Sequence, residues 1–122
     1  MKTFTLIGVS ALALAISAPA VAQNQSTVTQ NGSDSNVDVT QTGSGNDSDV
    51  TQEAATSFND ADVVQSGTNA ISTVTQGGTG TDAANPNTVT VNQAGDDAES
   101  LITQNGGDRL EIAVDQTGDS YS

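Results

Sequence analysis

The chain has 122 residues, carries 15 acidic residues against two basic ones for a net charge of −13, and contains no cysteine or histidine. This composition excludes a disulfide framework and leaves no Cys–His or Ser–His pair for nucleophilic catalysis. The negative charge disfavours nucleic acid and anionic lipid as partners, so we expect a protein that is not an enzyme, takes no cofactor and does not insert into membranes.

Residues 1–22 are predicted to be a secretory signal peptide. Lys2 supplies the positive charge at the start, and an apolar run of roughly 13 residues follows from Phe4 to Ile16. The small residues of segment 20–22 offer a cleavage site before Gln23. We therefore expect residues 23–122 to be exported, with an uncleaved membrane anchor as the alternative. Cleavage would leave Arg109 as the only basic residue.

A glutamine repeat runs through residues 23–122. Eight glutamines each follow a β-branched residue by two positions, and seven of them precede a glycine by two, Ala54 being the exception. The glutamines are Gln30, Gln41, Gln52, Gln65, Gln76, Gln93, Gln104 and Gln116. The β-branched residues are Val28, Val39, Val50, Val63, Val74, Val91, Ile102 and Val114. The glycines are Gly32, Gly43, Gly67, Gly78, Gly95, Gly106 and Gly118. Since residues two apart on a strand share a face, each unit predicts a short strand that ends in a turn.

Alternate strands differ four positions before the glutamine. One type carries serine there, at Ser26, Ser48, Ser72 and Ser100. The other type carries an apolar residue, at Val37, Ala61, Val89 and Ile112. The unit is therefore strand-turn-strand. The whole is predicted to be an all-β solenoid with two parallel four-stranded sheets, in which neighbouring strands lie about 4.8 Å apart. We expect valines and isoleucines inside and a glutamine ladder along the stack.

The polar, low-aromatic composition also resembles that of a disordered or prion-like tract. A disordered tract has no reason to keep valine and glutamine in register. The repeat therefore favours an ordered final state.

One segment matches a known repeat at every position. The pattern S-x5-Q-x-G-x2-N-x-[AS]-x3-Q is filled within 35–52 by Ser35, Gln41, Gly43, Asn46, Ser48 and Gln52. Further copies run over 59–76 and 87–104, with half-repeats at 26–32 and 110–118. In the second copy the asparagine is displaced to Asn69, and in the third Ala98 replaces it. Residues 23–122 thus resemble the curlin repeat family of bacterial curli fibres.

The resemblance implies a secreted structural subunit that polymerises into curli-like amyloid fibres on the cell surface and supports adhesion and biofilm. It implies three partners: further copies of the chain, a nucleator subunit, and a dedicated outer-membrane secretion channel. Whether the chain is the major subunit or the nucleator stays open.

Elementary energetics also favour polymerisation. The inward apolar side chains are few, and the end strands of a four-coil stack are unpaired templates for another chain. Charge opposes assembly, because Asp38 and Asp62 are expected to face outward one strand spacing apart, with Asp49 and Asp60 adding to the same field. We therefore predict faster fibre formation at pH 4 than at pH 7 in low salt.

The alternative function is a soluble secreted β-solenoid that binds calcium, ice or a surface ligand. Segment 77–84 fits one copy of a calcium nonapeptide, and segment 45–49 resembles a cation loop. Outward T-x-T pairs, interrupted by Asp49 and Leu101, resemble an ice-binding face. Thioflavin-positive fibres with cross-β diffraction would favour the fibre subunit over this binding module.

Overall fold

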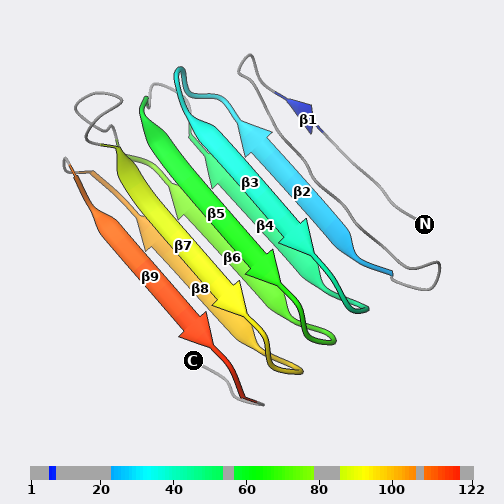
Figure 1. The fold of residues 1–122 in the computed structure, drawn as a ribbon. Helices are drawn as coiled ribbons and strands as arrows, with labels where there is room; N and C mark the ends of the chain where they lie inside the picture. Colours follow the sequence, from blue (N-terminus) through cyan, green and yellow to red (C-terminus); the bar gives the residue numbers. More distant parts are fainter. Residues whose placement is uncertain (1–5, 8–22, 54–56, 79–85, 107–108, 119–122) are drawn as a thin grey trace.

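The computed structural model describes residues 6–7, 23–53, 57–78, 86–106 and 109–118, which fold as a β-solenoid (Figure 1). One sheet contains β2 (Gln25–Gln30), β4 (Asp47–Gln52), β6 (Ile71–Gln76) and β8 (Glu99–Gln104) in that order. The facing sheet contains β3 (Asn36–Gln41), β5 (Asn59–Gln65), β7 (Asn87–Gln93) and β9 (Glu111–Gln116). Every pairing is parallel, and successive strands alternate between sheets. The predicted all-β solenoid with two parallel four-stranded sheets is confirmed.

The strands form where polar and inward-facing residues alternate. In β3, for example, Val37, Val39 and Gln41 are buried while the residues between them are partly exposed. The pairing register aligns like with like, so that Val39 lies beside Val63 and Gln41 beside Gln65. A slip by one residue would turn this whole inward set to solvent, and burial therefore holds the register.

The apolar core is a narrow seam between the two sheets. Its members are Val28, Val37, Val39, Val50, Ala61, Val63, Val74, Val89, Val91 and Ile102, each at most 5 % exposed. Ile112 and Val114 of β9 pack against this cluster but are only partly buried. The seam is therefore covered along the stack and open to solvent at its C-terminal end.

Stacked glycines let the corners approach closely. A Cβ on Gly43 would lie 2.1 Å from the carbonyl oxygen of Gly67, and a Cβ on Gly67 would lie 2.0 Å from that of Gly95. Both distances are far inside van der Waals contact. Gly43 also has φ of +86°, a conformation that favours glycine. At this edge the glycines are needed for the contact between coils as well as for the turn.

A two-residue strand, β1 (Leu6–Ile7), extends the first sheet beyond β2. Leu6 pairs with Val28 and Ile7 with Thr29, in parallel. Most of the predicted signal peptide, including its cleavage site, lies outside the described residues. Within the described part of the chain, no helix is long and apolar enough to cross a membrane.

Candidate functional site

Two continuous ladders of glutamine side chains run the length of the stack. In the first sheet Nε2 of Gln30, Gln52 and Gln76 each donates to Oε1 of the next glutamine, at 3.0, 2.9 and 3.0 Å. In the facing sheet Gln41, Gln65 and Gln93 do the same at 2.8, 2.9 and 2.9 Å, and Gln116 is the last acceptor. All eight predicted ladder glutamines are at most 7 % exposed.

Each ladder also ties the two sheets together. Gln65 on β5 donates from Nε2 to the carbonyl oxygens of Asp47 and Ala70, at 3.0 and 3.1 Å, at the edge of the opposite sheet. Gln52 does the same with Asn36 and Asn59. The carbonyl oxygen of Ala70 also accepts the backbone N–H of Asp47 at 2.8 Å, so the amide of Gln65 is a second donor to this corner carbonyl. The bonds along the stack were predicted from the sequence, whereas these bonds between the sheets were not.

The ladders have a direction. All six bonds between ladder glutamines run from donor to acceptor toward the C-terminal end, so the N-terminal coil presents Oε1 of Gln30 and Gln41, to which no other glutamine of the described chain donates. At the other end Gln104 Nε2 bonds to the carbonyl oxygen of Leu110. The N-terminal and C-terminal faces of the stack are thus chemically different.

Buried asparagines line both edges of the solenoid. Asn46 donates from Nδ2 to the carbonyl oxygens of Thr42 (2.7 Å) and Gly67 (3.1 Å), and its Oδ1 accepts the backbone N–H of Ala70 at 2.9 Å. Asn24 accepts from the backbone of Asn46 in the same way. Asn46 was predicted as a corner residue; Asn24 was missed, although it precedes Ser26 by the same two positions that separate Asn46 from Ser48.

The opposite edge has its own asparagine line, which the sequence analysis noted only as repeat starts. Nδ2 of Asn87 donates to Oδ1 of Asn59 at 3.2 Å, and Oδ1 of Asn87 accepts the backbone N–H of Leu110 at 3.0 Å. The backbone N–H of Asn59 bonds to Ser35 Oγ. Ser35, Asn59 and Asn87 are therefore equivalent in successive coils, and serine or asparagine at this position forms a hydrogen bond at the corner.

Asn69, to which the asparagine of the second copy is displaced, does not occupy the buried corner position. Asn69 is exposed, has φ of +57°, and donates to Asp97 Oδ1 at 3.2 Å on the outside of the turn. The buried position beside Asn46 is held by Ala70, one residue later. The asparagine line at this edge therefore ends at Asn46, because alanine has no side-chain amide to continue it.

The four repeat serines point inward and are buried, as expected of small core residues. Ser100 Oγ donates to Ser72 Oγ at 3.3 Å. Ser26 and Ser48 are different, because their hydroxyl oxygens are buried without a hydrogen-bond partner. Burying a hydroxyl without a partner costs free energy, so these two serines lower the stability of the fold. Their small side chains still fit the narrow seam.

Acidic side chains gather on the outer face of the sheet that contains β3 and β5. Asp38 pairs directly with Asp62. The pKa of Asp62 is raised by partial burial and, to a lesser extent, by the charges of Asp38 and Asp60. Asp49 does not add to this field as expected, because it lies on β4 in the opposite sheet. Alternate strands belong to different sheets, which separates it from the cluster.

The structure changes one of the two proposed calcium motifs. Only the first two residues of segment 45–49 lie in the turn: Asp47–Gln52 is strand β4, whose Ser48 points inward while Asp47 and Asp49 are exposed. In the described part of the chain no group of three acidic residues could hold a metal ion. Of the other calcium motif, residues 79–84 lie outside the described residues.

The threonine rows face outward but only one is continuous. Thr29, Thr51, Thr75 and Thr103 align in one line across the first sheet. The neighbouring line reads Thr27, Asp49, Thr73 and Leu101, with Leu101 74 % exposed. A flat face of paired threonine rows is therefore broken by a charge and a large apolar side chain.

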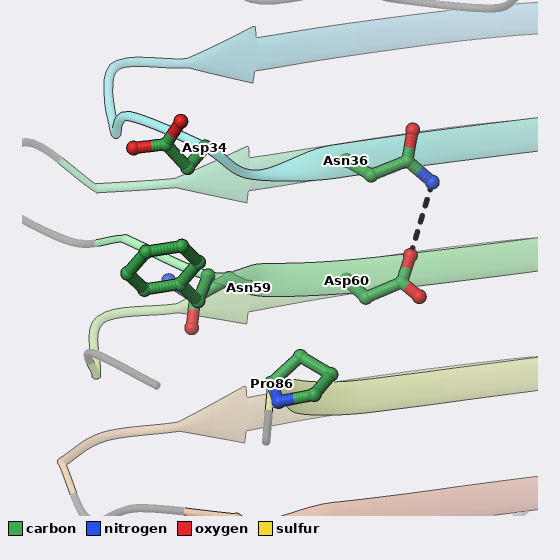
Figure 2. Close-up of a pocket in the computed structure, with 6 residues that line it drawn as sticks. Asp34, Asn36, Asn59, Asp60 and Pro86 are labelled. Carbon is green, nitrogen blue, oxygen red and sulfur yellow. Dashed lines mark hydrogen bonds between the residues drawn. The ribbon is translucent and has the colours of Figure 1, made fainter. Parts of the chain in front are cut away.

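A shallow hollow of about 150 Å³ lies at the corner that leads into β3, β5 and β7. Figure 2 shows the residues around it. Its lining residues are Asp34, Asn36, Phe58, Asn59, Asp60 and Pro86. Nδ2 of Asn36 donates to Asp60 Oδ1 at 3.1 Å along its rim. Asp34, Phe58 and Pro86 therefore lie along one corner in three successive coils of the stack.

Comparison of the chain with models of protein families, with curated proteins and with solved structures gave no match.

Proposed function

We propose that the protein is a secreted structural subunit that polymerises end to end into curli-like amyloid fibres at the cell surface. The observation that carries the proposal is the pair of open-ended glutamine ladders. Their bonds repeat at every coil, and nothing in their geometry limits the stack to four strands per sheet.

The C-terminal end of the stack supports this proposal. Within the described residues, β8 and β9 each have a strand partner on one side only. Ile112 and Val114 leave apolar surface partly exposed beside that free edge. An unpaired strand edge with adjoining apolar side chains is a template for another strand. Addition of a further coil would bury both features at once.

The outer faces suit a subunit that must stay soluble before it assembles. Acidic residues such as Asp38, Asp49 and Asp62 point away from the seam, so charge repulsion acts between free chains without entering the core. The resemblance to curlin repeats suggests the remaining parts of the proposal, namely a nucleator subunit and an outer-membrane channel as partners, and a role in adhesion and biofilm.

Fibre growth tests the proposal directly. Purified protein is incubated at micromolar concentration, and thioflavin fluorescence, electron microscopy and fibre diffraction are recorded. We expect unbranched fibres with reflections near 4.8 and 10 Å. A chain that stays monomeric and folded under these conditions would contradict the proposal and favour a soluble binding module. Calcium titration and a thermal hysteresis assay on that monomer would then identify its ligand.

A further inference from the structure

One corner of the solenoid places the only arginine in line with an aspartate. The pairs Asn36–Asp60, Asn59–Asn87 and Thr88–Glu111 define the register of β3, β5, β7 and β9. Extended by one or two residues toward the N-terminus of each strand, this register places Asp34 beside Phe58, Phe58 beside Pro86, and Pro86 beside Arg109. Asp34 thus begins this line at the N-terminal coil and Arg109 ends it at the C-terminal coil.

The two ends of the line have the same backbone conformation. Asp34 has φ of +53° and Arg109 has φ of +59°, and both side chains are exposed. Phe58 between them has φ of +54°. At this position the last coil therefore has the same backbone conformation as the first, and a further coil can continue the line.

We propose that the fibre junction preserves this register, so that Arg109 of one copy forms an ion pair with Asp34 of the next. This inference rests on the proposed function and adds the contact that selects the register of assembly. In the junction β8 lies beside β2 of the next copy and β9 beside β3. Gln104 and Gln116 then reach Gln30 and Gln41, and both ladders continue.

The remaining charges agree with this register. Glu111 meets Asn36, Ala113 meets Asp38 and Asp115 meets Thr40 of the next copy, so no acid of β9 lies beside another acid. The two nearest registers that keep the same faces inward are slips of two residues. One slip brings Glu111 beside Asp38, and the other brings Asp115 beside Asp38 and Glu111 beside Asp34. Like charges directly opposite each other destabilise a sheet, so both slips are disfavoured.

Strand β1 has a consequence for the junction. Leu6 and Ile7 pair with the edge of β2 that the next copy needs. The junction therefore forms on a chain from which this strand has been displaced or removed. Experiments on the junction should compare the full chain with a chain that begins at Gln23.

Charge reversal tests the ion pair, with seeded elongation measured by thioflavin fluorescence in low salt. Arg109→Asp alone and Asp34→Arg alone each place like charges at the junction, and we expect roughly fivefold slower elongation for each. An equimolar mixture should regain the wild-type rate, because the two variants are complementary when they alternate. The double variant Asp34→Arg/Arg109→Asp should also regain it. Electron microscopy should show fibres in the mixture. Mass spectrometry of the collected fibres should find the two chains in equal amounts.

A second double variant controls for net charge. Asp49→Arg/Arg109→Asp has the same net charge as Asp34→Arg/Arg109→Asp, but it keeps like charges at the junction because Asp49 lies on the central strand β4, so its elongation should stay slow. If wild-type chains form no fibres, both the proposed function and the junction are overturned. If wild-type chains form fibres but either single reversal elongates at the wild-type rate, or Asp34→Arg/Arg109→Asp is no faster than Asp49→Arg/Arg109→Asp, the junction is wrong and the proposed function stands.

Discussion

The side-chain amide of Gln52 lies 2.9 Å from Oε1 of Gln76, its equivalent in the next coil. Both residues are fully buried, and the same Nε2 also donates to two backbone carbonyls at the edge of the facing sheet. One amide therefore holds neighbouring coils together and holds the two sheets together. In this solenoid a polar side chain contributes to the interior in the way that an apolar side chain does in an ordinary core.

Replacement of a central ladder glutamine should destabilise the solenoid strongly. Gln65→Leu removes the acceptor of Gln41 and the donor of Gln93, both buried. Because each buried group left unpaired costs about 1–3 kcal/mol, we expect a loss of about 2–5 kcal/mol in the free energy of unfolding. Urea denaturation followed by circular dichroism measures it. Gln25→Leu, at an exposed position of β2, is the control; equal effects of the two variants would show that burial of the amide is unimportant.

Close stacking of glycines predicts a large effect for a single methyl group. In Gly67→Ala the new Cβ would meet the carbonyl oxygen of Gly95 at 2.0 Å, and a backbone atom cannot rotate away. We expect a loss of about 3 kcal/mol or more. The matched variant is Gly106→Ala, where φ is +75° but nothing lies within 4 Å. There only backbone strain of about 1–2 kcal/mol is expected. Thermal melts compare the two, and a milder effect at Gly67 would contradict the stacked corner.

Acid should stabilise the face around Asp62. Its folded-state pKa lies above the ordinary value of 3.8, so the folded protein favours the protonated form. The associated stability is complete below pH 3.8 and is lost as the pH rises through the raised pKa. Asp62→Asn should therefore raise the urea midpoint at pH 7 and reduce its change between pH 3 and pH 7. Asp49→Asn, flanked by Thr27 and Thr73, is the control. A pH profile unaltered by Asp62→Asn would refute this origin of the pH dependence.

The N-terminal strand should slow assembly while it is attached. Because Leu6–Ile7 pairs with β2, a chain that retains residues 1–22 has one edge of its first sheet already occupied. We expect seeded elongation to be several-fold faster for a chain that begins at Gln23. Ile7→Pro in the full chain removes a backbone donor from this pairing and should recover part of the difference. If the full chain elongates as fast as the shorter one, β1 does not guard this edge.

The inward faces of the strands could be predicted from the local sequence pattern, whereas the hydrogen bonds at the corners were not predicted. The inward face of each strand was readable because side chains alternate strictly, so Val63 and Gln65 had to share a face. Asn24, Asn59 and Asn87 were overlooked although each lies six positions before a ladder glutamine, which is the inward phase of the two-residue period. Only the structure shows that their amides bond the corners of neighbouring coils.

The sequence by itself determined the strands, their inward faces and the lines of glutamine, since all three depend on spacing within a few residues and on the two-residue period of a strand. Only the tertiary structure decided which distant residues become neighbours. It separated Asp49 from Asp38 and Asp62, joined each glutamine to the facing sheet, and placed Arg109 on the same line as Asp34. Coils differ in length through insertions at their corners, and only the hydrogen-bonded register of the strands determines how the corners align.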